Sequence, residues 1–172
     1  MSRYAIALLM FAFTLTLSAC TSGEKQEEKK VAAAPAQLHA PATSDDKEWK
    51  LYLQQVVGQH MEGVTDRVFP YYLPANSTQP TPGDPGNRSQ YDRQLENVQS
   101  VLARNVLPGN MLVFGSPDSA KMADLLVAAV ATGKADSLKG SQILFIGKAE
   151  DNGRAQAAAE AVGAKYTFVE AK

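Results

Sequence analysis

The stretch that decides the fold is residues 111–169, MLVFGSPDSAKMADLLVAAVATGKADSLKGSQILFIGKAEDNGRAQAAAEAVGAKYTFV. It contains three short apolar runs, and the two segments between them carry apolar residues at helical spacing. The runs span residues 111–114, 142–146 and 165–169, and the helical segments span 118–131 and 153–162. Short apolar runs that alternate with helices are typical of a parallel sheet with covered faces. The sequence therefore predicts an α/β fold with a small three-stranded parallel sheet.

The segment 111–170 as a whole has the βαβαβ order of a Rossmann-like unit, whose crossovers should be right-handed. Two amphipathic helices precede it, over residues 45–65 and 89–105, where apolar side chains recur every three or four residues. We expect a single α/β domain spanning residues 45–172, in which these two helices cover part of the sheet.

A proline-rich loop over residues 69–88 is expected between the two helices. It contains five prolines, so regular structure is not expected there. Tyr71 and Tyr72 are candidates for an interaction surface, because tyrosine is enriched at protein interfaces. The alternative is that these tyrosines, together with Phe69 and Leu73, attach the loop to the rest of the domain.

The composition limits the classes of function. The chain has 172 residues, is 45% hydrophobic and 20% charged, and carries a formal net charge of −1. This near-neutral charge leaves no electrostatic footprint for nucleic acid, so no nucleic-acid partner is expected. One cysteine excludes a disulfide within the chain and a multi-cysteine zinc site. The phosphate-binding Walker pattern and the dinucleotide glycine pattern do not occur, and no cofactor is expected.

Residues 1–19, MSRYAIALLMFAFTLTLSA, have the features of a signal peptide. Arg3 supplies a positive charge, and the apolar stretch 4–17 is shorter than the roughly 20 residues that span a bilayer. Residues 17–20, LSAC, resemble the lipobox of bacterial lipoproteins, which combines an apolar residue, small residues and a cysteine.

The resemblance implies that Cys20 receives a diacylglycerol thioether and becomes the mature N-terminus. Two or more acyl chains anchor a protein stably, so the lipid bilayer is the expected partner of acylated Cys20. Under the enterobacterial sorting rule, an aspartate after the cysteine implies retention in the inner membrane, but Thr21 stands there. The implied location is the bacterial outer membrane, with the lipid-anchored domain facing the periplasm.

Residues 20–44 join the modified cysteine to the domain. After Cys20 this segment is rich in Glu, Lys, Ala and Pro, and it contains no Phe, Trp or Tyr. Such a composition does not bury enough apolar surface to offset the entropy of an ordered chain. We therefore expect a disordered tether that holds the domain away from the membrane.

Polar residues follow two of the predicted strands, at the carboxyl ends where open α/β sheets bind their ligands. The candidates for ligand binding are Ser116, Asp118, Ser119, Lys148 and Asp151. Backbone amides at a helix start can hold an anion, and Lys148 would add positive charge. Asp118, Glu150 and Asp151 are instead candidates for holding a divalent cation, although the preference for negative charge at helix starts also explains them.

The sequence gives little indication of catalysis. Ser116 is suited to cap the helix that follows it, with Pro117 at the first helical position. His60 is the only histidine after the tether, so a Ser-His-Asp set would have to use it. No nucleophile-elbow pattern is present. We therefore assign no catalytic residue and no metal site.

The expected function is that of a membrane-anchored periplasmic lipoprotein with a non-enzymatic binding or protein-interaction domain. Its partner would be an unknown envelope protein, contacted through Tyr71 and Tyr72 or through strand pairing at a sheet edge. The alternative is a small-ligand-binding domain or metal-assisted hydrolase that uses the strand ends near Ser116, Asp118 and Asp151. A concave pocket at those ends, with Asp118 and Asp151 within coordination reach, would favour the alternative. A filled surface there, with exposed tyrosines on the 69–88 loop, would favour interaction.

Overall fold

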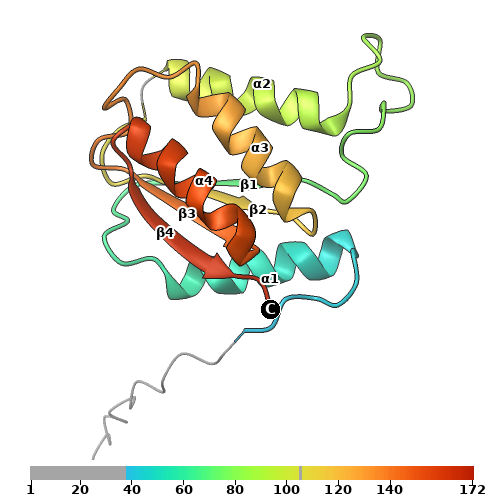
Figure 1. The fold of residues 1–172 in the computed structure, drawn as a ribbon, viewed down its shortest axis with the longest axis horizontal. Coiled ribbons are helices and arrows are strands. Elements are labelled where there is room, and N and C mark those ends of the chain that lie inside the picture. Colours follow the sequence, from blue (N-terminus) through green and yellow to red (C-terminus); the bar gives the residue numbers. More distant parts are fainter. Residues whose placement is uncertain (1–37, 105) are drawn as a thin grey trace, which may run out of the picture. The chain divides into compact units, whose positions relative to one another are not determined.

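Four parallel strands form the sheet, one more than the sequence predicts (Figure 1). The computed structural model describes residues 38–104 and 106–172, which belong to one compact unit. In chain order the elements are α1 (Asp46–Gln59), β1 (Val68–Tyr72), α2 (Gln90–Ala103), β2 (Met111–Gly115), α3 (Ser119–Val130), β3 (Gln142–Gly147), α4 (Ala149–Ala161) and β4 (Lys165–Glu170). The α/β class and the parallel pairing are confirmed, and the strand order in the sheet is β1-β2-β3-β4. The predicted signal peptide, Cys20 and the predicted tether as far as residue 37 lie outside the described residues.

The additional strand, β1, overlaps the proline-rich loop in which we expected no regular structure. Its residues pair in register with Met111–Gly115 of β2. The Met111 N–H donates to the Arg67 carbonyl at 2.8 Å, and alternate residues of a strand direct their backbone groups to the same side. The nitrogen of Pro70 therefore faces the open edge, where a missing N–H removes no ladder hydrogen bond. The expectation was wrong because proline excludes a central strand but not an edge strand.

Ion pairs to Asp84 hold the rest of the proline-rich loop. Its carboxylate lies 3.3 Å from Nε of Arg88 and 3.1 Å from Nη1 of Arg93 in α2. Hydrogen bonds from the backbone and side chain of Arg88 hold the pKa of Asp84 well below its usual range. These contacts tie the loop to the first turn of α2.

The two faces of the sheet are covered unequally. Each strand lies next to the preceding strand of the chain, and always on the same side of it. Right-handed crossovers between such strands all pass over the same face of the sheet, and they place α2, α3 and α4 there. Figure 1 shows these three helices above the sheet and α1 alone below it. Among the described residues the strand order never reverses, so the sheet has no switch point of the kind at which doubly wound sheets bind ligands. The Rossmann-like arrangement that we expected is therefore not confirmed.

Each face of the sheet has its own hydrophobic core. The larger core lies under the three crossover helices and includes the fully buried rings of Phe114 and Phe145. Helix α4 approaches the sheet closely because it presents small side chains there, and Ala155 has no exposed surface. The smaller core lies between α1 and the opposite face and consists of Trp49, Tyr52, Leu53, Val56, Met111, Val113, Leu144 and Ile146.

Helix α1 runs antiparallel to the strands. At its start, Tyr72 Oη donates to Asp46 Oδ1 at 2.8 Å, at the carboxyl end of β1. Just beyond its end, Gln142 Nε2 donates to the Glu62 carbonyl at 2.9 Å, at the start of β3. A Cβ at Gly115 would be 2.4 Å from Leu53 Cδ2, so α1 packs tightly on β2. One helix covers the middle of this face and leaves the edge strand partly uncovered.

The domain begins earlier in the chain than expected. The composition places residues 38–44 in the tether, but Leu38 and Ala40 pack against the smaller core. The carbonyl of Thr43 also accepts a hydrogen bond from Trp49 Nε1 at 2.8 Å. Composition does not reveal these contacts, because two apolar side chains are enough for a short segment to pack against a core that other residues form.

The helices also end and begin at other residues than predicted. Helix α1 ends at Gln59, where Nδ1 of His60 lies 2.8 Å from the Val56 carbonyl oxygen. Helix α4 begins before its predicted start and contains Gly153 in its interior. Within residues 38–104 and 106–172, no helix has the length and apolar character needed to cross a membrane.

Candidate functional site

Ser119 and Asp151 lie together at the carboxyl ends of β2 and β3. The Ser119 Oγ donates to Asp151 Oδ2 at 2.6 Å and accepts from the Lys148 N–H at 2.8 Å. Both side chains are buried, with 4% and 5% of their residue surface exposed. Arg154, in the next turn of α4, donates to Asp151 Oδ1 from Nη2 at 2.6 Å and from Nε at 3.1 Å. The negative charge of Asp151 is therefore compensated within the fold.

Arg154 connects this pair to α3. Its guanidinium also donates to the Ala120 carbonyl at 2.9 Å and contacts Asp124. The hydrogen bond to Asp151 raises the pKa of Arg154. Burial raises the pKa of Asp124, but hydrogen bonds from Arg154 and Lys121 bring it below its usual value. We call Ser119, Asp124, Asp151 and Arg154 the polar cluster, and its contacts join α3 to α4.

Ser116 and Asp118 stabilise the turn between β2 and α3. Ser116 Oγ donates to the Leu73 carbonyl at 2.8 Å and accepts from the Asp118 N–H at 2.9 Å. Asp118, not Ser116, is the N-cap of α3, and its Oδ1 accepts from the Lys121 N–H at 3.1 Å. The prediction that Ser116 caps the helix was wrong, because its hydroxyl turns inward to the chain that follows β1.

A hollow of about 340 Å³ lies at the carboxyl ends of the strands, and Ser116, Ser119 and Lys148 line it. Neither Asp118 nor Asp151 is part of its lining. Glu150 is exposed, 4.0 Å from Nζ of Lys148. Within the described part of the chain, no group of three or more His, Cys, Asp or Glu side chains is arranged to hold a metal ion. The candidate acidic residues are thus separated rather than gathered at one site.

His60 lies at the other end of the sheet from the candidate serines. It directly follows α1, close to Glu62, which contacts Gln142 at the start of β3. Ser116 and Ser119 instead follow the carboxyl end of β2. The fold therefore does not bring His60 to either serine, and no Ser-His-Asp set is formed with them.

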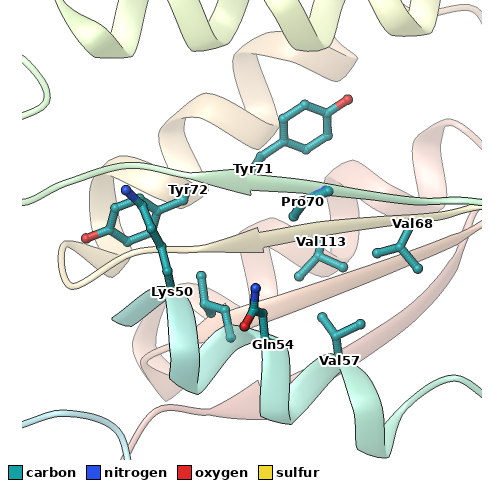
Figure 2. Close-up of a pocket in the computed structure, with 9 residues that line it drawn as sticks. Lys50, Gln54, Val57, Val68, Pro70, Tyr71, Tyr72 and Val113 are labelled. Atoms are coloured by element: carbon teal, nitrogen blue, oxygen red, sulfur yellow. The ribbon is translucent and has the colours of Figure 1, made fainter. Parts of the chain in front are cut away.

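Tyr71 and Tyr72 point to opposite faces of the sheet (Figure 2). Tyr71 is 3% exposed, and its ring stacks on Phe114 with the ring centroids 5.0 Å apart. Burial raises the pKa of Tyr71 to about 12, and its hydroxyl has no hydrogen-bond partner among the described residues. Tyr72 is half-buried on the α1 side, where it donates to Asp46. Of the two tyrosines, Tyr72 alone retains substantial exposed surface.

A cleft of about 450 Å³ lies between α1 and the edge strand β1. We call it the edge cleft, and it is lined by Lys50, Leu53, Gln54, Val57, Val68, Pro70, Tyr71, Tyr72 and Val113. In Figure 2, Gln54 and Val57 project from α1 toward the sheet, and Val68 and Val113 lie on β1 and β2 opposite them. The cleft forms because α1 packs against β2 and does not extend over the edge strand.

Two exposed polar side chains border the apolar floor of the edge cleft. Nζ of Lys50 lies 5.2 Å from the ring centroid of Tyr72, and Gln54 follows one turn later on α1. Within the described residues, neither Lys50 nor Gln54 makes a side-chain hydrogen bond or an ion pair. Burial, and then the hydrogen bond to Asp46, raise the pKa of Tyr72. Among the described residues that line the cleft, Lys50 alone is charged.

Reasoning from the sequence did not find the edge cleft. Leu53, Val57 and Val113 belong to apolar stripes or runs, which indicate core positions. Val68 directly precedes the loop expected at residues 69–88, and Pro70 lies within it. A cleft arises here from the number of helices on one face, and this number depends on the strand order, which the sequence does not reveal.

Comparison of the chain with protein-family models, with curated proteins and with solved structures gave no match.

Proposed function

We propose that this chain is a lipid-anchored protein of the bacterial envelope whose domain binds an apolar ligand in the edge cleft, without catalysis. The observation that carries the proposal is a difference in hydrogen bonding between the polar side chains of the hollow at the strand ends and those of the edge cleft. At the strand ends, Ser116, Ser119 and Asp151 are engaged by neighbours in the fold. At the edge cleft, Lys50 contacts the ring of Tyr72, but within the described residues neither Lys50 nor Gln54 makes a side-chain hydrogen bond or an ion pair. An apolar floor with a few polar groups beside it is typical of ligand sites of roughly 300–1,000 Å³.

The proposed envelope location rests on the resemblance of residues 17–20 to a lipobox. Acyl chains on Cys20 would hold the domain at the outer membrane, facing the periplasm, on the tether that begins at Thr21. Expression in a Gram-negative bacterium with radiolabelled palmitate tests this. We expect label on the wild-type protein, which should fractionate with membranes, and none on Cys20→Ala. Equal labelling and fractionation of both proteins would refute the lipoprotein assignment.

Pairing with a partner strand is less well supported at β1 than ligand binding in the cleft. The Arg67 carbonyl accepts from Met111 of β2, and the direction of the backbone groups alternates along the strand. The backbone groups of Val68, Pro70 and Tyr72 therefore point to the open edge. Pro70, in the middle, has no N–H to donate, and proline at an edge discourages strand addition. We therefore place binding in the edge cleft beside this strand rather than on its backbone.

Site-specific photo-cross-linking in cells tests binding at the edge cleft. A photoreactive residue at position 57 would lie in the cleft lining, whereas Leu51 is 56% exposed and does not line it. Both positions are on α1, so they form a matched pair. We expect a cross-linked adduct from position 57 and none from position 51. Adducts at neither position, or at both equally, would refute the cleft as the binding site.

A further inference from the structure

We infer that the ligand of the edge cleft is an amphiphile with an alkyl tail and a single carboxylate, held by Lys50 at the cleft mouth. The inference rests on the proposed function and adds the chemical class of the ligand to it. Its basis is the combination of an aliphatic floor with one cation that has no ion-pair partner among the described residues.

The floor of the edge cleft fits an alkyl chain. The half-buried Val57 and Val68 supply branched aliphatic surface. The buried Leu53 and Val113 lie beneath it, and Pro70 lies at the edge. The ring of Tyr71 points to the opposite face of the sheet and offers nothing to a ligand in the cleft (Figure 2). Burying each methylene of a tail there contributes about 0.8 kcal/mol to binding, which favours a chain of several carbons.

The charge of the head group follows from Lys50. It is the one charged residue of the lining, and no carboxylate lies within ion-pair distance of it among the described residues. Asp46, one turn earlier on α1, instead accepts a hydrogen bond from Tyr72. An anionic head would pair with the Lys50 ammonium and accept from the Gln54 amide, whereas a cationic head would be repelled.

A carboxylate suits this mouth better than a more highly charged group. One lysine compensates one negative charge, and no second cation of the described residues lines the cleft. A phosphate with about two negative charges would leave excess charge beside Asp46. An extended peptide would need the edge of β1, where Pro70 lacks the central donor.

Calorimetric titration of residues 21–172 with decanoate tests the inference. This fragment contains every described residue, including both cores and the whole sheet, and needs no detergent. The comparison ligands are decyltrimethylammonium, which has the same tail and a cationic head, and acetate, which lacks the tail. We expect decanoate to bind at least about tenfold more tightly than decyltrimethylammonium, because the heads differ in sign at one lysine. Acetate should show no heat of binding.

Three variants locate the site. Lys50→Gln should weaken decanoate binding about three- to fivefold, as expected for one exposed ion pair, and leave decyltrimethylammonium binding no weaker. Lys47→Gln removes the same charge from α1 outside the cleft and should change neither affinity. Val57→Asp places a carboxylate in the floor and should abolish decanoate binding. Circular dichroism and a cooperative thermal transition show that each variant is folded.

The outcomes separate the ligand class from the proposed function. Equal affinity for decanoate and decyltrimethylammonium, with no effect of Lys50→Gln, would overturn the carboxylate assignment but leave an apolar binding cleft. Equal losses in Lys50→Gln and Lys47→Gln would overturn the role of Lys50 in the same way. No decanoate binding by the folded protein, together with a protein-sized adduct at position 57 in cells, would overturn the ligand class in favour of a protein partner.

Discussion

The strand ends and the edge cleft differ in how their side chains are used. At the strand ends, the polar cluster exchanges hydrogen bonds among its own members, and Asp151 is neutralised by Arg154. At the edge cleft, the side chains of Val57 and Val68 are partly open to solvent, and Lys50 has no charged partner among the described residues. Chemically reactive residue types therefore stabilise the fold at the strand ends, whereas aliphatic residues line the cleft in which we propose that the ligand binds.

The largest effect that separates the two regions is expected from Asp151→Ala. It removes the acceptor of the buried Ser119 hydroxyl and one partner of Arg154, which should lower the free energy of unfolding by about 2–3 kcal/mol. Decanoate affinity should not change. Urea denaturation and calorimetry measure the two quantities.

Glu150→Ala is the matched control for Asp151→Ala, because the neighbouring Glu150 is exposed. Its unfolding free energy should stay within about 0.5 kcal/mol of wild type. If Asp151→Ala were as stable as Glu150→Ala but lost ligand binding, the polar cluster would be a functional site. The strand ends, and not the edge cleft, would then be the region that binds the ligand.

Gly115→Ala should show how tightly α1 is fixed over the middle of the sheet. A Cβ there would meet the Leu53 side chain at 2.4 Å, and overpacking of this kind costs about 1–3 kcal/mol. Gly58 lies on α1 itself, and no heavy atom of the described residues with which a new side chain could clash lies within 4 Å of a Cβ added there. Gly58→Ala should stabilise the protein by roughly 0.5–1 kcal/mol, because alanine favours helix over glycine. Equal effects of the two substitutions in urea denaturation would mean that α1 is not packed as described.

Alkaline pH should destabilise the three-helix side of the sheet through Tyr71. Burial raises the pKa of Tyr71 to about 12 from the usual 10.0, so the unfolded chain releases this proton at lower pH than the folded one. The stability linked to Tyr71 is complete below pH 10 and is lost as the pH rises toward about 12. Tyr71→Phe should lose less stability over this interval. Unfolding curves at several pH values measure the difference, and parallel curves for both proteins would contradict the burial of this hydroxyl.

At neutral pH the smallest effect is expected from Tyr71→Phe. The Tyr71 hydroxyl has no partner among the described residues, so its removal should leave stability unchanged or slightly increased. Tyr166→Phe is the matched comparison, because Tyr166 Oη donates to Asn152 Oδ1 at 2.9 Å. It should lose about 0.5–1.5 kcal/mol. A larger loss in Tyr71→Phe than in Tyr166→Phe would indicate a hydrogen bond that the structure does not show.

Much of the fold was predictable because it depends on local patterns. The apolar runs at 111–114, 142–146 and 165–169 and the helical spacing between them indicate a parallel α/β unit without further information. The strand at Val68–Tyr72 was missed because Pro70 is compatible with a strand only at an edge, and edge position is a property of the whole sheet.

The candidate site was less predictable than the fold. Ser119 and Asp151 are far apart in the chain, and their hydrogen bond, which ends their availability to a ligand, exists only after the strands pair. The edge cleft depends on the width of the sheet relative to one covering helix. The i,i+3 spacing of Asp151 and Arg154 is a local pattern, but neither the contact of Asp151 with Ser119 nor the extent of α1 over β1 follows from local sequence patterns.

Nuclear magnetic resonance of isotope-labelled residues 21–172 during titration with decanoate tests the central claim most directly. Backbone amide shifts should move saturably for Gln54 and Val57 on α1 and for Val68 on β1, with little change at Ser119 and Lys148. Shifts concentrated at Ser119 and Lys148 would contradict the edge cleft as the binding site and restore the strand ends as the site of ligand binding.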